Sequence, residues 1–401
     1  MNPVQVGAAI ASLRKKNNLT QAALARILCV SDKTVSKWET GQGYPEISLL
    51  PQLAAAFGVT VDNLLCGEYA GIAVIGNLHS DYVRNVDANP HPRGQANITS
   101  STRYAGGSVS NITFNLSKID PTIPLYAFGC VGNDADGSYI LSRLQRHFIK
   151  TSGITSVNSP TGVNELISTP TEGIFLLRTA GANVMFDPQN IDVFGLTCRI
   201  AHFGRLTLFP RFWDPDEDYG CKLAHVLNDL QEANIQTAIS ILANKQAPKK
   251  EQLALVLKHC DYVLMTAELL GSICNTAIGQ EALSDYTAIQ ACMQQVFDLG
   301  VQKKVFVFIG DYIGFCLNKN GGFCTCQMKE VPPEESVHQF GLADDISSGC
   351  LFGLYHNYPD IEILKFGLGV ATVSVTSKYN DDGMRPKREI VQIINDNPSN
   401  D

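Results

Sequence analysis

The sequence has no long uninterrupted run of apolar residues. No stretch of the 401-residue chain approaches the roughly 18 uncharged apolar positions that a membrane-spanning helix requires. The first 14 residues are amphipathic and do not place an apolar centre after a charged start, as secretory leaders do. We therefore expect a cytoplasmic protein without a membrane partner. The length of 401 residues is sufficient for two or three domains, and the 45% hydrophobic content is that of an ordinary globular protein.

Closely spaced cysteines are also scarce. The 12 cysteines are scattered, no Cys-x-x-Cys pair occurs, and only Cys324 and Cys326 lie close together. Structural zinc sites are usually built from such pairs. We therefore expect buried free thiols rather than disulfides or a zinc site, and we assign no metal ligands.

The chain has fewer basic than acidic residues, 31 against 39, and the two kinds are unevenly distributed along it. The formal net charge is −8, but residues 1–67 hold six basic and four acidic side chains and so carry +2, which leaves −10 on the remainder. A mildly basic N-terminal part on an acidic body favours contact with nucleic acid through that part alone.

Residues 1–67 show the pattern of several short helices. Val6, Ile10 and Leu13 form an apolar stripe on the first, while Thr20 and Ser31 are N-cap residues for two helices that a three-residue break separates. Two short helices joined so tightly should cross steeply, which is helix-turn-helix geometry. The helices that we predict after the first are 21–28, 32–39, 46–57 and 61–65.

Three segments of this part, 18–25, 30–41 and 53–65, resemble the Cro/repressor-type helix-turn-helix family. The resemblance implies an all-α domain at 1–67 that binds double-stranded DNA, and members of this family usually bind as homodimers. Trp38 lies on another side of its helix and is expected in the core. The residues to which we assign DNA contact are Gln21, Ser31, Asp32, Lys33, Ser36 and Lys37.

Within this set, the resemblance implies that Gln21 contacts a phosphate and that the residues after Ser31 face the major groove. Lys33 and Lys37 are four residues apart and share a helix face, from which lysine can donate to guanine N7 and O6. Contact with phosphates or solvent alone is the alternative for either lysine.

Beyond residue 70, apolar runs alternate with helical patterns. This alternation favours an α/β sheet covered on both faces, with ligands at the C-terminal ends of its strands. The strands that we predict are 72–75, 125–128, 262–265 and 305–309, and the helices are 107–118, 138–148, 221–232 and 250–258.

Polar residues and glycines follow the first predicted strand and begin the first helix of this part. Asp81 and Asn111 can together pair with vicinal hydroxyls, and Gly106 and Gly107 let the backbone approach a ligand. Ordinary roles as a turn residue and a helix-start residue are the alternatives.

The stretch 337–349 should open a buried helix. Gly341 and Ala343 come before the carboxylate of Asp344, and an apolar helical pattern follows. Free amides at a helix start form an anion site, and a carboxylate beside them can serve as a base. Plain helix capping is the alternative.

The order of these motifs, at 71–83, 90–94, 106–111, 128–137 and 341–344, resembles the ribokinase-like PfkB carbohydrate kinases. The resemblance implies an α/β ribokinase-like three-layer domain with a small β lid. The boundaries that we expect are 68–70 for a linker, 71–385 for this domain, about 79–105 with 170–187 for its lid, and 386–401 for a C-terminal tail.

The resemblance also implies roles for single residues. Asp344 would take the proton from the attacking hydroxyl, while the amides of Gly341, Leu342 and Ala343 would stabilise charge on the transferring phosphoryl group. ATP and Mg²⁺ would be the cofactors of an active enzyme. Asp345 is about a hundred degrees further round the helix and is expected to be solvated. The sugar-binding residues would be Asp81, Gly106, Gly107 and Asn111, and the nucleotide-binding residues Thr266 and Gly310.

Three departures from the family pattern lie at the nucleotide end. Ala343 replaces a glycine, at a cost that is mild if its φ is negative and about 1 kcal/mol or more if it is positive. The Asn-x-x-Glu motif is replaced by Thr266 and Leu269, with Glu268 one position off and expected on a different face. The Thr-x-Gly motif keeps only Gly310. His338 could replace a lost donor, and a structural role, which is the more frequent one for a lone histidine, is the alternative.

The sugar end is thus retained, whereas the nucleotide and metal end has lost polar groups. The leading hypothesis is a transcription regulator whose kinase-derived domain senses a sugar or a related small molecule. The rival is an active ATP-dependent sugar kinase with a fused DNA-binding domain. A nucleoside or a vitamin-like alcohol stays open as the ligand, because this fold serves several substrate classes.

Overall fold

The computed structural model of the chain divides into two compact units, Met1–Ala70 and Gly71–Asp401, called here the head and the body. The expected linker, 68–70, and the predicted helix 61–65, apart from residues 61 and 64, lie outside the described residues. The structure describes residues 3–17, 19–59, 61, 64, 71–92, 94–193, 195–241, 248–276, 278, 286–310, 312–331, 341–376 and 383–396.

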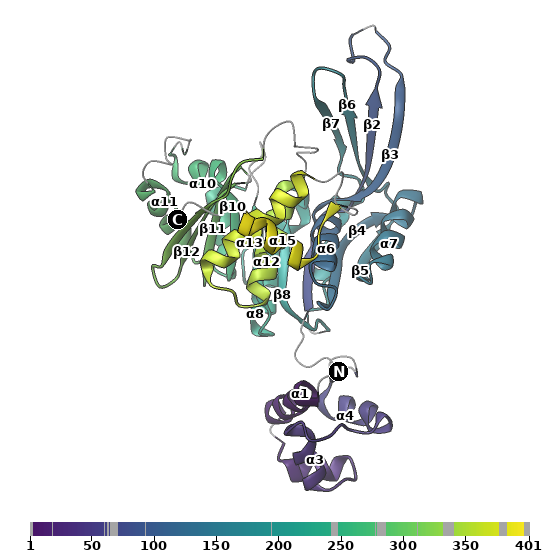
Figure 1. Cartoon of the computed structure of the whole chain (residues 1–401), viewed down its shortest axis with the longest axis vertical. Coiled ribbons are helices and arrows are strands. Elements are labelled where there is room, and N and C mark those ends of the chain that lie inside the picture. The colour runs from purple at the N-terminus through teal and green to yellow at the C-terminus, as the bar shows by residue number, and fades with distance from the viewer. Residues whose placement is uncertain are drawn as a thin grey trace. The chain divides into compact units, whose positions relative to one another are not determined.

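The head is a bundle of short helices (Figure 1). Thr20 Oγ1 accepts a hydrogen bond from Ala23 N, and Ser31 Oγ accepts one from Thr34 N, so both predicted N-caps are confirmed. The predicted helix 46–57 is instead a short 3₁₀ turn that continues into an α-helix. The elements are α1 Pro3–Lys16, α2 Gln21–Ile27, α3 Asp32–Glu39, η1 Ile47–Leu49 and α4 Leu50–Phe57.

A small apolar core and one ion-pair network hold the head together. Trp38 is 4% exposed and packs in this core, as predicted. Arg14 Nε donates to Glu39 Oε1 at 2.6 Å, and Gln21 Nε2 donates to Glu39 Oε2 at 2.7 Å. This network joins the first three helices at the side of α3 that carries Glu39.

The body is built on one nine-stranded sheet whose order is β13-β12-β11-β10-β9-β8-β1-β4-β5 (Figure 1). The strands from β11 to β5 in this order pair in parallel, and β12 and β13 are antiparallel. The strands are β1 Gly71–Ile75, β4 Leu125–Gly132, β5 Lys150–Val157, β8 Cys198–Gly204, β9 Gln236–Ile241, β10 Tyr262–Thr266, β11 Lys304–Ile309, β12 Ile313–Asn318 and β13 Phe323–Gln327.

Helices cover both faces of this sheet, which explains why its central strands are apolar throughout. On one face lie α6 Ser108–Ile119, α7 Ala135–Arg146, α12 Leu342–Tyr355, α13 Asp360–Val375 and α15 Lys387–Asp396. On the other lie α8 Lys222–Glu232, α9 Lys250–Leu257, α10 Ala267–Cys274 and α11 Thr287–Phe297. The predicted α/β three-layer architecture is confirmed.

A second sheet of four strands, in the order β3-β2-β6-β7, projects from the body and forms the lid (Figure 1). Its strands are β2 His79–Val86, β3 Ile98–Gly106, β6 Gly162–Ser168 and β7 Ile174–Thr179. The second lid segment therefore begins earlier than the expected 170–187, because β6 pairs in parallel with β2. Residues 181–185 form a 3₁₀ turn outside the lid sheet, with Ala182 and Phe186 in the core of the body.

Two other expectations concern apolar and sulfur-containing residues. Over the described ranges, none of the helices combines the length and the hydropathy needed to cross a bilayer. The described cysteines are free thiols and most of them are buried, as the sequence predicted.

Candidate functional site

The site lies where the chain changes direction across the sheet. From β1 the chain continues through β4 and β5 on one side, whereas β8 and the strands that follow it lie on the other. The crevice outside the carboxyl ends of two such strands is the usual ligand site of open α/β sheets. Asn77 follows β1 at this point, and Arg205 follows β8.

The predicted sugar-binding residues meet beside the predicted base. Asn111, in the first turn of α6, donates from Nδ2 to Asp344 Oδ2 of α12 at 2.9 Å. A β-carbon on Gly106 would lie 1.8 Å from Asp81 Oδ2, so the glycine backbone rests directly against that carboxylate. Gly107 is the N-cap of α6 and has φ of 88°. Tertiary packing thus brings residues from the lid, α6 and α12 close together.

Burial and nearby arginines together set the ionisation of the two carboxyl groups. Burial raises the pKa of Asp344, and the positive charges of Arg205 and Arg178 and the hydrogen bond from Asn111 oppose that rise. Burial raises the pKa of Asp81 to about 7, with a contribution from the negative charge of Asp344. A carboxylate of raised pKa is a stronger base, which suits Asp344 to accept a proton from a hydroxyl.

The start of α12 has the geometry of an anion site. Gly341 is its N-cap, with φ of 90°, a conformation that favours glycine. The amides of Leu342 and Ala343 belong to the first turn, where no carbonyl of the same helix can accept from them. Ala343 is helical and is not among the residues with positive φ, so the methyl group it adds carries only the mild cost.

The expectation that Asp345 is solvated is wrong. Its side chain is 0% exposed, and its Oδ1 accepts from Asn115 Nδ2 of α6 at 2.7 Å. Burial raises its pKa to about 7, while hydrogen bonds from Ser374 and Asn115 limit the rise. The reason is that α12 is buried on all sides from Asp344 onward, between the sheet, α6 and α13, and therefore has no solvated face there.

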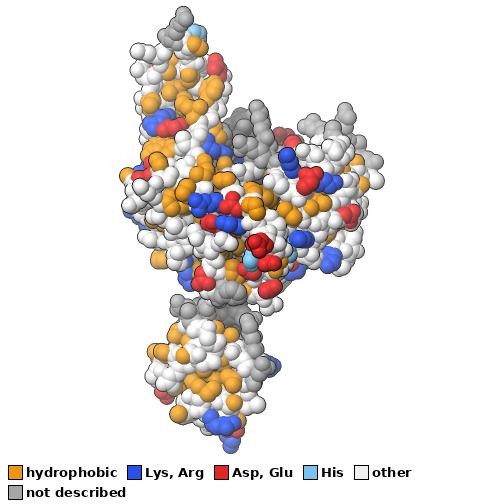
Figure 2. Space-filling model, turned by 180° about the vertical axis from the view of Figure 1, so that it is seen from behind, with side chains coloured by type: hydrophobic (Ala, Val, Ile, Leu, Met, Phe, Trp, Pro, Cys, Tyr) orange, Lys and Arg blue, Asp and Glu red, His pale blue; other side chains and the backbone are white. Residues whose placement is uncertain are grey.

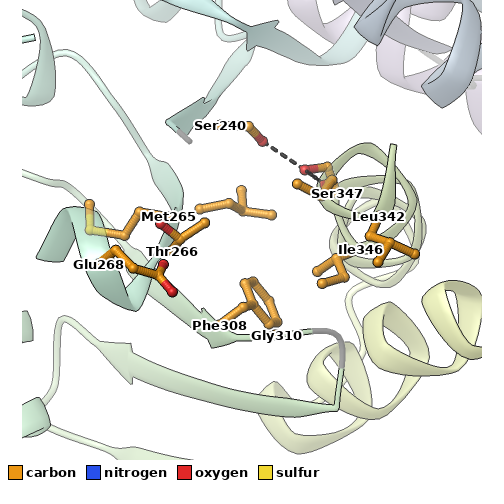
Figure 3. A pocket seen from close by; sticks show the side chains of 11 residues that line it. Ser240, Met265, Thr266, Glu268, Phe308, Gly310, Leu342, Ile346 and Ser347 are labelled. Carbon is orange, nitrogen blue, oxygen red and sulfur yellow. Dashed lines mark hydrogen bonds between the residues drawn. The ribbon is translucent and has the colours of Figure 1, made fainter. Parts of the chain in front are cut away.

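A cavity of about 250 Å³ lies next to this helix start (Figure 3). Thr266 and Gly310, predicted at the nucleotide site, line it together with Leu342 and Ala343. Glu268 also lines it, so the expectation that this side chain lies on a different face is wrong: it is in the first turn of α10, which starts at the end of β10. The other lining residues are Ser240, Leu264, Met265, Phe308, Ile346 and Ser347.

The polar groups of this cavity are few and partly engaged with one another. Ser240 Oγ lies 2.8 Å from Ser347 Oγ and 2.7 Å from His202 Nε2, and burial lowers the pKa of His202 to about 3. Thr266 Oγ1 is buried and has no hydrogen-bond partner within the described part of the chain. These groups and the helix start fit a nucleotide whose base sits among apolar side chains and whose phosphates approach α12.

The described residues contain no group of three or more His, Cys, Asp or Glu side chains arranged to hold a metal ion. Mg²⁺ in phosphoryl transfer is commonly held by one or two carboxylates together with the phosphates. Glu268 is the carboxylate of the cavity that could take this part.

Three residues near the predicted sugar-binding carboxylate and the predicted base were not among the site residues predicted from the sequence. Asn164 Nδ2 donates to Asp81 Oδ1 at 2.7 Å, and Arg178 Nε donates to Asn164 Oδ1 at 2.9 Å. Arg205 is a non-glycine residue with φ of 55°. Asn164 and Arg178 lie on lid strands that have no distinctive local motif. Arg205 is a single arginine after an apolar strand, a pattern that does not indicate a functional role.

The head presents an exposed basic face. Lys33 and Lys37 are exposed on α3, with Asp32 exposed and Ser36 half-buried beside them, and Figure 2 shows basic side chains at the end of the head that carries α3. Ser31 Oγ is used in the N-cap of α3. The remaining members of the predicted DNA-contact set are thus available at the surface, apart from Gln21, whose bond to Glu39 leaves one N–H for a phosphate.

The head and the body match different families of known proteins. Residues 10–64 match the helix-turn-helix family, and 56 residues are 50% identical to the HTH-type transcriptional activator BcrR of Enterococcus faecalis. That match covers 14% of this chain and 28% of the relative, so it concerns the head alone.

The body matches sugar kinases over almost its whole length. The chain is 23% identical over 325 residues to the 5-dehydro-2-deoxygluconokinase of Geobacillus kaustophilus, covering 77% of this chain and 90% of the relative. A ribokinase from Thermotoga maritima superimposes with a TM-score of 0.65 at 18% identity, over 81% of this chain and 99% of that one. A ribokinase from Arabidopsis thaliana, solved with ribose and ATP, gives 0.64 at 17% identity, over 81% and 98%.

The pfkB family carbohydrate kinase profile matches residues 70–387, which is most of the chain. A helix-turn-helix domain is thus fused to a kinase-like domain, and by the extent of this second match the chain belongs to the pfkB family of carbohydrate kinases.

Proposed function

We propose that this protein is a cytoplasmic, DNA-binding transcription regulator whose body binds a sugar or a related polyol and passes its occupancy to the head. The observation that supports this proposal is the hydrogen bond from Asn111 to the buried Asp344, on the same chain as a helix, α3, with exposed lysines. Carboxylates and amides together bind vicinal hydroxyls, and exposed lysines on a recognition helix bind DNA.

DNA binding is assigned to α3 acting in a homodimer. A single small head makes few contacts, whereas two heads on paired half-sites combine their affinities. Lys33 and Lys37 contact base edges or phosphates, with Gln21 on a neighbouring phosphate. Ligand binding would act by shifting the population of lid or dimer states, which requires that the ligand bind those states with different affinities.

The test is a fluorescence-anisotropy titration of operator DNA with the full-length protein, with and without ligands found by thermal-shift screening of sugars and nucleosides. Replacing both Lys33 and Lys37 by Ala should weaken operator binding by about tenfold or more, since each base or phosphate contact contributes on the order of 1 kcal/mol. The exposed Lys329→Ala variant in the body is the matched control. Operator affinity that no pocket-binding ligand changes would contradict the regulatory role.

The second candidate is ATP-dependent phosphorylation of the bound hydroxyl. The observation that favours it is the buried Asp344, hydrogen-bonded to Asn111 beside the anion site of Gly341, Leu342 and Ala343. Thr266, Glu268 and Gly310 would hold ATP and Mg²⁺, which supply the phosphoryl group and neutralise its charge. Asp344 would remove the hydroxyl proton, and the first-turn amides would stabilise the oxygens of the transferring group.

This candidate is tested by coupling ADP release to NADH oxidation across a panel of sugars and nucleosides. Turnover that is lost in Asp344→Asn while ligand binding persists would establish phosphoryl transfer. Absence of ADP release for ligands that demonstrably bind would leave sensing as the function of the pocket.

A further inference from the structure

Arg205 combines a strained backbone with an unpaired charge at the switch point of the sheet. It follows β8 and has φ of 55°, a conformation that costs a non-glycine residue about 1 kcal/mol or more. Gly204 before it packs so closely on α6 that a β-carbon would lie 2.9 Å from Ser108 Oγ. Within the described part of the chain, the guanidinium of this half-buried arginine has no hydrogen-bond or ion-pair partner. Such strain at a crevice is typical of a residue held in place for function.

Arg178 reaches the same pocket from the lid. Its Nε donates to Asn164 Oδ1 at 2.9 Å, and Asn164 in turn donates to Asp81 at 2.7 Å. The chain of contacts therefore fixes this guanidinium next to the predicted sugar-binding carboxylate. It leaves the two Nη atoms of Arg178 available for another acceptor.

The charges of Arg178 and Arg205 both influence the pKa values of His79 and Asp344. Desolvation lowers the pKa of Arg178, and the charge of Arg205 lowers it further. The pKa of the buried His79 falls to about 3, through burial first and then through Arg178 and Arg205. Both arginines also oppose the raised pKa of Asp344. Contacts place the two residues at the same point of the fold. Gly204, next to Arg205, packs on Ser108 at the start of α6, and Asp81, to which Asn164 links Arg178, packs on Gly106 just before that helix.

Among the described residues, no carboxylate is bonded to either guanidinium group. Two such groups near one site can together bind an anion. We propose that the ligand of this pocket is a polyol that carries an acidic group, a carboxylate or a phosphate, which Arg178 and Arg205 bind. Arginine binds both anions through paired, charge-assisted hydrogen bonds. The bound anion would also relieve the repulsion between the arginines. The inference rests on the proposed function, because it names the class of ligand for that same pocket.

The test uses matched sets of probes on the full-length protein. Ribose, arabinose, glucose and galactose are compared with their aldonates and with their terminal phosphates, by thermal shift and by isothermal titration calorimetry. We expect at least one aldonate or sugar phosphate to bind at least about tenfold more tightly than its neutral parent. The aldonate and phosphate arms distinguish the two kinds of anion.

Variants then assign the effect to the arginines. Arg205→Met and Arg178→Met should each weaken binding of the acidic probe by about ten- to a hundredfold. Arg205→Met should change binding of the neutral parent little, whereas Arg178→Met also removes the contact that holds Asn164 beside Asp81. Arg205→Lys should recover part of the loss, because it restores the charge without the paired donors. Arg211→Met is the matched control, since Arg211 lies on the following turn and is 3.8 Å from Asp187.

Tighter binding of neutral parents, or equal weakening of neutral and acidic probes in the arginine variants, would overturn the inference while leaving the proposed function in place. Binding of no probe in either class would overturn both. If the acidic probe binds but does not change operator affinity, the inference stands and the regulatory role fails.

Discussion

Asp344 and Asp345 are neighbours in the first turn of one helix, and both are buried, yet their surroundings differ. Asp344 is bonded to Asn111 and lies in the field of two arginines, so it faces the ligand pocket. Asp345 is bonded to Asn115 inside the packed layer of helices, where its Oδ2 and Asn115 Oδ1 are both unpartnered. A buried carboxylate in such a place should reduce the stability of the fold when it is ionised.

The first prediction concerns the pH dependence of stability at Asp345. Its folded pKa of about 7 lies above the unfolded value of about 3.9, so the folded protein holds the proton more tightly between these values. Its contribution to stability therefore falls as pH rises through this window, and the full cost is present above pH 7. Asp345→Asn should raise the free energy of unfolding at pH 8 by about 1 to 3 kcal/mol and change it little near pH 4.

The asparagine amide at position 345 can also donate to the unpartnered Asn115 Oδ1. Urea unfolding of the body, followed by circular dichroism at both pH values, measures the effect. The exposed Asp218→Asn variant is the control. A variant that is less stable than the native protein at pH 8 would show that the charge at Asp345 is needed for the fold.

Two sets of contacts between secondary-structure elements concern the stability of the head and the attachment of the lid to α7. In the head, Glu39 accepts from both Arg14 and Gln21 and so ties α3 to α1 and α2. In the body, Arg103 and Tyr82 of the lid both bind Asp136, in the first turn of α7. The first set should control the stability of the head, and the second the mobility of the lid.

The second prediction is that Glu39→Gln destabilises the head by about 1 to 3 kcal/mol, because Arg14 loses a charged partner. Burial raises the pKa of Glu39, but the hydrogen bonds from Arg14 and Gln21 outweigh it and the net pKa is lowered. The carboxylate therefore stabilises the head above its unfolded pKa of about 4.3, and this stability is lost as pH falls through the folded pKa. Trp38 fluorescence in a Trp213→Phe background reports urea unfolding of the head.

The control is Glu46→Gln, which makes the same substitution at an exposed residue of the head. Equal unfolding midpoints for Glu39→Gln and Glu46→Gln at pH 7 would mean that the ion pair contributes nothing measurable. A difference that persists unchanged well below pH 4 would exclude ionisation of Glu39 as its cause.

The third prediction concerns the junction of the lid. Arg103 donates to Ser80 Oγ and to Ala135 O, both at 2.9 Å, and its guanidinium lies 4.1 Å from the centre of the Tyr139 ring. Arg103→Met removes the ion pair and the stacked cation while keeping an apolar side chain. Amide hydrogen exchange in β2 and β3 should become faster by about tenfold, which corresponds to ~1.4 kcal/mol.

Arg84→Met is the control for the lid, because Arg84 pairs with Glu165 within the lid sheet and does not reach α7. Equal acceleration in the two variants would mean that the lid responds to loss of any surface ion pair. Acceleration throughout the body would mean that Arg103 supports the global fold rather than the junction.

At the scale of the whole molecule, the lid leaves an apolar edge uncovered. Among the described strands, β7 pairs with β6 alone and is the end strand of its sheet. Phe175 and Leu177 are 41% and 59% exposed on it, and Figure 2 shows hydrophobic side chains along one side of the lid. Unpaired apolar edges are typical places for contact with another chain. We infer that this strand contacts a second copy of the chain in the proposed homodimer.

The fourth prediction is that Leu177→Lys shifts the protein from dimer to monomer in light scattering after size-exclusion chromatography. A lysine on the edge strand opposes pairing with a second copy. Operator affinity should fall with it, because two linked heads bind more tightly than one. Leu177→Ile preserves apolar character and is the matched control. A monomeric native protein, or a dimer unaffected by Leu177→Lys, would exclude this edge as the interface.

Local features of the chain were readable from the sequence. The N-caps Thr20 and Ser31, the helices of the head and the buried strands follow from hydrogen bonding and periodicity among residues close in sequence. The ordered glycine and carboxylate motifs likewise indicated which residues belong to the pocket, and Asn111 and Asp344 do meet there.

Tertiary structure alone decided which side chains are buried and which charges meet. Asp345 is buried because α6 and α13 pack around its helix, and Glu268 lines the cavity because α10 begins where β10 ends. Arg178 and Arg205 come from a lid strand and a turn, and their convergence depends on pairing between segments far apart in the chain. Burial and electrostatic fields arise from such long-range contacts, which no local pattern of residues encodes.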